Sequence, residues 1–231
     1  GDCRKLPSAG GTLCPSYRAT RNEKDTTRAR ANALRQYLTD SDKENKFDQE
    51  ELYQVFDLCV SCKACASECP SNVDIASMKA EFLYQYQKAN GFSNRNKTFA
   101  YNAKLNNLGS LTPRLTNWFA NLSFVKKKMG IAPQRVVPHL APKTFRKWLD
   151  THHKELEEGT YPNGQVILFC DEFTNFYDVG VGVDTYELLT KLGYQVVVVD
   201  HQESGRAFIS KGFWNKLKQS QRLMSIFLKN W

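Results

Sequence analysis

Hydrophobic positions recur with a helical period through most of the first 130 residues. Apolar side chains return every three to four positions in three segments that carry helix-start or helix-stop residues at their ends, namely 22–38, 48–58 and 74–91. The same pattern predicts further helices near 96–107, 112–129 and 143–156. The chain is therefore predicted to be mostly helical.

The pattern changes after residues 157–163. Two apolar runs of strand length, 165–170 and 194–200, enclose an amphipathic segment, 182–193, that ends at a glycine. This order predicts a strand–helix–strand unit with parallel strands. Two strands are too few for an independent domain, so we expect this part to be incomplete or to be completed by a partner.

The last 26 residues, 206–231, are predicted to form one helix with its apolar side chains on one side: Phe213, Leu217, Met224, Phe227 and Trp231. Lysines and an arginine accompany them, so two interpretations are open. The helix can pack on the strand–helix–strand unit, or it can lie on a membrane surface. Packing is the favoured interpretation, because a buried helix face shows the same pattern.

The chain carries a formal net charge of +8, from 32 basic and 24 acidic residues. Such a surplus suits nucleic acid, an anionic membrane surface or an acidic partner. The basic residues are dispersed, however, and 124–130 is the one tight run, without a basic stripe around it. Dispersed charge is typical of a solvated surface, so nucleic-acid binding is not expected.

Neither a membrane span nor a signal peptide is predicted. The sequence has no run of 18 apolar residues, and its first residues have no apolar core. A reducing cytoplasmic setting is therefore expected, with peripheral contact to the inner face of a membrane left open by the last segment.

Seven cysteines occur, and six lie in the first 69 residues: Cys3, Cys14, Cys59, Cys62, Cys65, Cys69 and Cys170. Their odd number and their clustering argue against a disulfide framework. Four follow the spacing C-x2-C-x2-C-x3-C, and a proline comes directly after the last. This is the spacing of ferredoxin cluster loops.

The spacing divides these four thiols between two 4Fe–4S clusters. Cys59, Cys62 and Cys65 are close enough in sequence to hold three irons of one cluster, whereas the cysteine before proline reaches the other cluster. Cys14 is also followed by proline. By the same logic it supplies the fourth ligand of the first cluster. Cys69 and Cys3 are then assigned to a second cluster, whose remaining ligands are expected upstream of residue 1.

A zinc site made by four thiolates is the alternative interpretation. Such sites usually pair two separate C-x2-C knuckles, and the sequence has no second knuckle. Cys170 lies in an apolar region and is predicted to be a buried core thiol. The four histidines give no metal-site spacing: His139, His152, His153 and His201. No catalytic residue is predicted.

The segments 1–38 and 58–87, with their cysteines and prolines, resemble the iron–sulfur region of FAD-linked D-2-hydroxyacid dehydrogenases of the D-lactate, glycolate and D-2-hydroxyglutarate type. They are similar, more distantly, to the iron–sulfur subunits of glycolate oxidase and anaerobic glycerol-3-phosphate dehydrogenase. Residues 166–212 look like the opening of the cysteine-rich domain that follows in these proteins.

This resemblance implies an electron-transfer module rather than an independent enzyme. Electrons would come from a flavin dehydrogenase domain or subunit carrying FAD, pass through the clusters, and reach a quinone or another acceptor. Both the flavin domain and the later Cys-Cys-Gly motifs are missing, so the chain is expected to be a segment of a longer polypeptide. A redox-sensing or nucleic-acid-binding metal module is the alternative function.

We therefore predict a mostly α fold with three parts. Residues 1–130 form a helical, ferredoxin-like iron–sulfur domain. Residues 131–160 form a linker with three prolines followed by a helix, and residues 161–231 form a partial α/β domain of the cysteine-rich type.

Overall fold

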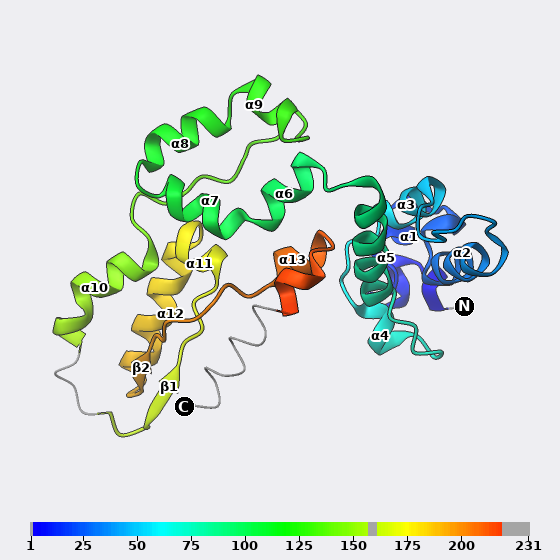
Figure 1. Ribbon diagram of the computed structural model, residues 1–231. Helices are drawn as coiled ribbons and strands as arrows, with labels where there is room; N and C mark the ends of the chain where they lie inside the picture. The colour runs from blue at the N-terminus through cyan, green and yellow to red at the C-terminus, as the bar shows by residue number, and fades with distance from the viewer. Residues whose placement is uncertain (1, 157–160, 219–231) are drawn as a thin grey trace. The chain divides into compact units, whose positions relative to one another are not determined.

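The computed structural model of the chain describes residues 2–156 and 161–218, and the side chains of residues 153–156 are left aside. Within these ranges the protein is mostly helical, as predicted (Figure 1). The chain divides into two compact units. The first comprises Gly1–Ser93 and Phe208–Leu217, and the second comprises Asn94–Ala207 and begins again at Lys218. The predicted domain bounds at residues 130 and 160 stay a prediction.

The first unit is built from short helices around the long helix α5. Its elements in chain order are η1 (Asp2–Arg4), η2 (Pro7–Ala9), α1 (Pro15–Thr20), η3 (Glu23–Asp25), α2 (Thr27–Asp40), α3 (Glu50–Asp57), α4 (Ala64–Glu68) and α5 (Ile75–Asn90), where η marks a 3₁₀ helix. The helix predicted over 22–38 is thus a 3₁₀ turn followed by α2. Thr26 separates them and caps α2 by accepting a hydrogen bond from the Ala29 amide at 3.0 Å.

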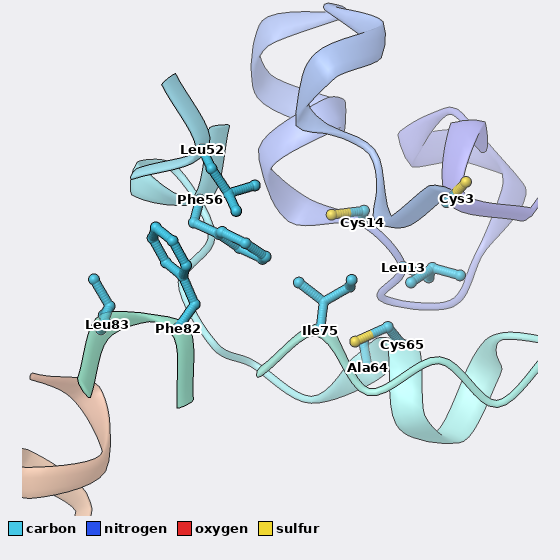
Figure 2. Close-up of a cluster of buried hydrophobic side chains, with 10 residues drawn as sticks. All are labelled: Cys3, Leu13, Cys14, Leu52, Phe56, Ala64, Cys65, Ile75, Phe82 and Leu83. Carbon is cyan, nitrogen blue, oxygen red and sulfur yellow. The ribbon is translucent and has the colours of Figure 1, made fainter. Parts of the chain in front are cut away.

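Aromatic and aliphatic side chains of α3 and α5 form the core of the first unit. Leu52, Phe56 and Phe82 are fully buried, and the rings of Phe56 and Phe82 stack with their centroids 5.3 Å apart. Figure 2 shows this core continuing past Ile75 to the buried cysteines Cys14 and Cys65. Cys14 and Cys65 therefore lie at the edge of a packed apolar core.

The segment after residue 207 returns to α5. α13 (Arg206–Ser210) is followed by a turn at Gly212, whose φ is +70°, so the prediction of one helix from residue 206 is wrong within the described residues. Side chains of the segment pack here: Phe213 and Leu217 are buried, and the Gln87 amide on α5 donates to the Lys211 carbonyl at 2.8 Å. The expected packing of these residues on the strand–helix–strand unit is therefore wrong, because they belong to the first unit. The rest of the predicted helix, 219–231, lies outside the described residues.

The described part of the second unit contains seven helices, two strands and the start of α13. In chain order they are α6 (Asn94–Ala100), α7 (Asn102–Gly109), α8 (Pro113–Ala120), α9 (Ser123–Lys128), α10 (Phe145–Leu156), β1 (Gln165–Ile167), α11 (Glu172–Phe176), α12 (Val179–Lys191) and β2 (Gln195–Val197). The helices predicted over 96–107 and 112–129 are each two shorter helices. Irregular backbone interrupts the first at Tyr101, and the second at residues 121–122.

The two strands pair in parallel, with Gln165 opposite Gln195 and Ile167 opposite Val197. The helix α12 connects them, as the pattern predicted for this stretch. Phe145 of α10 is fully buried against this unit, and Gly182 of α12 lets it approach, since a Cβ there would lie 2.8 Å from the Phe145 ring. This close contact is why the helix tolerates a glycine in its interior.

The proline-containing segment 131–142 has no helix or strand but is tied to α8 and α9. The Asn117 side chain exchanges two hydrogen bonds with the Leu140 backbone, at 2.8 and 2.9 Å. The buried Lys126 ammonium donates to the carbonyls of Pro133 and Arg135. The segment is therefore held in the second unit by side chains rather than by regular secondary structure.

Candidate iron–sulfur site

Four cysteines from two parts of the sequence, Cys14 and the loop 59–65, line one cavity in the first unit. The cavity has a volume of about 320 Å³, counted to its open mouth, and its walls include Cys14, Cys59, Cys62 and Cys65. These are the four thiols that spacing assigned to one cluster. Cys3 and Cys69 are absent from the lining residues. In Figure 2 the sulfurs of Cys14 and Cys65 point toward Ile75, whereas the sulfur of Cys3 points away from them.

Left-handed backbone shapes the loop that carries three of these cysteines. Ser61 and Lys63, on either side of Cys62, have φ angles of +54° and +62°. Non-glycine residues adopt this conformation rarely, and it is found preferentially where a ligand is held. These two residues, one on each side of Cys62, curl the chain, and Cys59, Cys62 and Cys65 line the same cavity.

The neighbouring helices fix the ends of this loop. Cys59 follows α3, and the Lys79 ammonium on α5 donates to the Cys59 carbonyl at 2.6 Å. Burial lowers the pKa of Lys79, although the nearby Cys59 thiol and Asp57 carboxylate oppose that shift. Cys65 lies in α4, and the amides of Ile75 and Ala76 at the start of α5 point to its sulfur. Burial nevertheless raises the pKa of the Cys65 thiol.

Glu68 joins the segment bearing Cys14 to the loop 45 residues later. Its carboxylate accepts hydrogen bonds from the Thr12 amide at 2.7 and 2.9 Å and from the Leu13 amide at 3.0 Å. These bonds hold the pKa of Glu68 below its usual range. Sequence reasoning missed this residue, because a glutamate inside a cysteine motif carries no signal of a partner 56 positions away.

Cys14 lies among polar donors. Its sulfur is 3.3 Å from the Ser16 hydroxyl and 3.6 Å from Nη1 of Arg30. Burial raises the pKa of the Cys14 thiol, but hydrogen bonds from Ser16 and Tyr17 and the Arg30 charge outweigh it, so the pKa is lowered. The surroundings of Cys14 therefore favour its thiolate, the form that ligates iron.

Arg30 is the second residue that sequence reasoning missed. Its side chain is fully buried, lines the cavity and is 3.6 Å from the Asp25 carboxylate. A buried guanidinium nitrogen, Nη2, has no hydrogen-bond partner in the described part of the chain. An unsatisfied cationic donor beside four thiols fits an anionic group in this cavity, and a 4Fe–4S cluster with four thiolates is such a group.

A single metal ion fits the arrangement less directly. Across residues 2–156 and 161–218, no three side chains of His, Cys, Asp or Glu meet closely enough to hold one ion. The four thiols instead surround a cavity. The seventh cysteine, Cys170, is buried in the second unit, as predicted, and burial raises its pKa to about 11.

Comparisons with known proteins also indicate an iron–sulfur domain. Residues 1–74 match the model of a 4Fe-4S dicluster domain family. The resemblance inferred from the cysteine motif is confirmed. The chain is 26% identical over 192 residues to the D-2-hydroxyglutarate dehydrogenase of Escherichia coli (strain K12), which covers 77% of this chain and 18% of that protein.

Two further relatives carry the same name. The enzyme of Haemophilus influenzae is 26% identical over 196 residues, covering 77% of this chain and 18% of the relative. The enzyme of Pantoea ananatis is 24% identical over 266 residues, covering 95% of this chain and 26% of the relative. The chain thus spans about a fifth to a quarter of the length of these relatives. No solved structure matches it.

The similarity extends beyond the matched domain into the second unit, because 77% to 95% of the chain is covered. The chain is therefore consistent with the iron–sulfur region of FAD-linked hydroxyacid dehydrogenases. Its iron–sulfur domain and its relatives support a role in electron transfer. None of the helices in the described ranges has the length and apolar character needed to cross a membrane.

Proposed function

We propose that this chain relays electrons, one at a time, from a flavin dehydrogenase that oxidises a D-2-hydroxyacid to a quinone or another acceptor. The observation that carries the proposal is the cavity shared by Cys14, Cys59, Cys62 and Cys65. These four residues would hold one 4Fe–4S cluster, and Cys3 with Cys69 would hold part of a second. A bound cluster supplies a centre that takes up and releases one electron.

The chain's own residues make the site suitable for such a centre. The amides of Ile75 and Ala76 point to the Cys65 sulfur, and the Ser16 hydroxyl lies beside the Cys14 sulfur. N–H and O–H donors to ligand sulfurs stabilise negative charge there, and they tune the potential together with burial. We assign no bond-making step to this chain. Removal of hydride from the hydroxyacid would belong to the FAD-carrying part of a longer protein or to a separate subunit.

The fold supports the same assignment at a coarser level. We propose that the first unit is a helical, ferredoxin-like domain and that the parallel strand pair with α12 begins a cysteine-rich α/β domain. A cytoplasmic location, with or without peripheral contact at the inner face of a membrane, belongs to the same proposal. The burial of Phe213 and Leu217 in the first unit favours packing over membrane contact for these two residues.

Anaerobic reconstitution of the chain with iron and sulfide tests this function. We expect about four irons and four sulfides per chain for the complete site, with an EPR signal on reduction. Stoichiometric zinc without sulfide would instead establish the zinc alternative. Salt-dependent binding to DNA or RNA would establish the nucleic-acid alternative.

Three variants test the ligand assignment. Cys14→Ser should lose the intact cluster, because Cys14 lies on the cavity wall. Cys69→Ser and the matched control Cys170→Ser should keep it, because neither residue lines the cavity. Retention of four irons by Cys14→Ser would show that the fourth ligand is another residue.

A further inference from the structure

The guanidinium of Arg30 is buried beside the proposed cluster ligands, although a buried charge is costly. Its exposed fraction is 0%. Nε donates to the Val55 carbonyl at 3.1 Å, and Nη1 donates to the Asp25 carbonyl at 2.7 Å and to the Ser16 hydroxyl at 2.9 Å. An arginine is always protonated in a protein, so these bonds hold a permanent positive charge at this place.

The hydrogen bonds of the Arg30 guanidinium leave one of its nitrogens unpaired at the cavity wall. Nη1 also reaches the Cys14 sulfur at 3.6 Å, and Nη2 has no hydrogen-bond partner within the described residues. The Asp25 carboxylate is 3.6 Å from Nη2, an ion-pair distance that is too long for a hydrogen bond. Asp25 is itself held by the Thr20 hydroxyl at 2.6 Å. The charge is therefore balanced incompletely, and it lies on the wall that carries Cys14.

A positive charge in a buried site favours whichever state of its neighbour is more negative. Reduction of a cluster adds one electron and therefore one negative charge. We propose that Arg30 is a positioning residue that holds Cys14 and raises the reduction potential of the cluster, and that Asp25 lowers this potential by opposing the charge. This inference rests on the proposed function.

The test compares midpoint potentials of the reconstituted chain in redox titrations followed by EPR. Arg30→Gln removes the charge but keeps an amide donor, so its potential should shift to a more negative value. The control Arg35→Gln makes the same change of charge at an exposed position of the same helix, α2, and should leave the potential unchanged.

Asp25→Asn keeps an oxygen for Thr20 and removes the opposing charge, so its potential should shift to a more positive value. Opposite shifts in the two variants support the inference, because a structural role would lower cluster occupancy without moving the two potentials apart. If Arg30→Gln loses the cluster, Asp25→Asn decides. An unchanged or more negative potential in Asp25→Asn overturns the inference, whereas a wild-type chain without a cluster overturns the proposed function.

A cavity in the second unit supports a separate inference that does not depend on the cluster. It has a volume of about 1200 Å³, counted to its open mouth, and lies among α6, α7, α8, α11 and the segment 129–140. Most of its lining is apolar, including Phe99, Leu105, Val137 and Phe173. A large apolar cavity with a few polar groups is the usual form of a small-molecule site.

Two amide side chains, one helical turn apart on α7, line this cavity. Asn106 is 7% exposed, and its Oδ1 accepts a hydrogen bond from the Tyr177 hydroxyl at 2.8 Å, which leaves Nδ2 buried without a partner in the described residues. Oδ1 of Asn102 is buried and lacks a hydrogen-bond partner there too. Unpaired buried amide atoms destabilise a fold unless a ligand or water satisfies them.

We infer that this cavity binds a neutral, mostly apolar molecule whose carbonyl oxygen accepts a hydrogen bond from Nδ2 of Asn106. Two probes with the same ring skeleton test it, 1-indanone with the carbonyl and indane without it, in NMR titrations of the chain. Indanone should bind about 5- to 10-fold more tightly, as one added hydrogen bond implies. Equal affinity for the two probes, or no saturable binding of either, would overturn the inference.

Variants then locate the preference on one side chain. Asn106→Leu keeps the bulk but removes the donor, so it should bind both probes equally. Asn107→Leu, at the exposed neighbouring position, should keep the preference for indanone. A preference that survives in Asn106→Leu would assign the recognition to another group.

Discussion

Buried polar groups have different partners in the two units of this chain. In the first unit, Asp25 and Arg30 are buried together, and their bonds reach Ser16 and Cys14 on the cavity wall. In the second unit, the buried Lys126 and the half-buried Asn117 bind the backbone of the segment 131–142. The buried polar groups thus position a thiol in the first unit, and in the second unit they hold the segment 131–142 in place.

The apolar side chains differ in the same way. The first unit encloses Phe56 and Phe82 completely, and the cysteines extend that core. The second unit encloses Phe145 but leaves large apolar side chains exposed on α7 and α8 and in the turn between them, including Leu108, Trp118 and Leu111. The packed core around Cys14 and Cys65 fixes where these two thiols lie, as ligands of a cluster require.

The largest expected loss of stability comes from removing a buried aromatic ring from the core of each unit. Phe82→Ala and Phe145→Ala each remove a fully buried ring and should lower the free energy of unfolding of their own unit by about 3–5 kcal/mol. Denaturant unfolding followed by circular dichroism measures both. We expect Phe82→Ala to lose the cluster signal on reconstitution and Phe145→Ala to retain it. Loss of the signal in both variants would show that the units depend on each other.

A smaller effect is expected at the joint between the Cys14 segment and α4. Glu68→Gln replaces the carboxylate that accepts hydrogen bonds from the Thr12 and Leu13 amides with a neutral group, so the free energy of unfolding should fall. Iron content after reconstitution should fall with it, because Cys14 is held less firmly. Glu44→Gln, at an exposed position, is the matched control. Equal iron content in the two variants would show that the hydrogen bonds of Glu68 do not hold Cys14 in place.

High pH should weaken the first unit slightly through Tyr86. A hydrogen bond to the Glu50 carboxylate raises the pKa of the Tyr86 hydroxyl to about 12. Because the folded pKa lies above the unfolded value of about 10, the stabilisation is complete below pH 10 and is lost as pH rises toward 12. We expect at most about 1 kcal/mol. Unfolding curves across this window, compared with Tyr86→Phe, measure it, and an equal slope in both proteins would contradict it.

The last prediction concerns the order in which the thiols are alkylated. Alkylation of an exposed thiol should leave the stability of the chain unchanged. Cys62 is exposed, whereas Cys170 is 3% exposed with a pKa raised to about 11 by burial. In the cluster-free chain at pH 8, iodoacetamide should therefore modify Cys62 first and Cys170 last. Mass spectrometry of the peptides after short exposure checks this order. Early modification of Cys170 would mean that the second unit opens readily.

Several features could be predicted from the sequence because they depend on neighbours in the chain. The helix α5 extends from the Asp74 cap to Gly91, close to its predicted bounds, since capping groups and a helical apolar period act locally. The parallel strand pair followed from two apolar runs around an amphipathic helix. Breaks within the helices near Tyr101 and Gly212 were missed, because packing against other elements decides whether a short helix continues.

The sequence by itself determined the character of the site. Cys59, Cys62 and Cys65 lie within seven residues, so their spacing already limits them to a cluster loop. The tertiary structure decided what surrounds that loop. The proline after Cys14 had already pointed to this thiol as the fourth ligand, but the structure alone shows that Glu68 holds the Cys14 segment and that Arg30 is buried against the Cys14 sulfur. Contacts between residues tens of positions apart depend on how a whole core packs, and no local pattern in the chain records them.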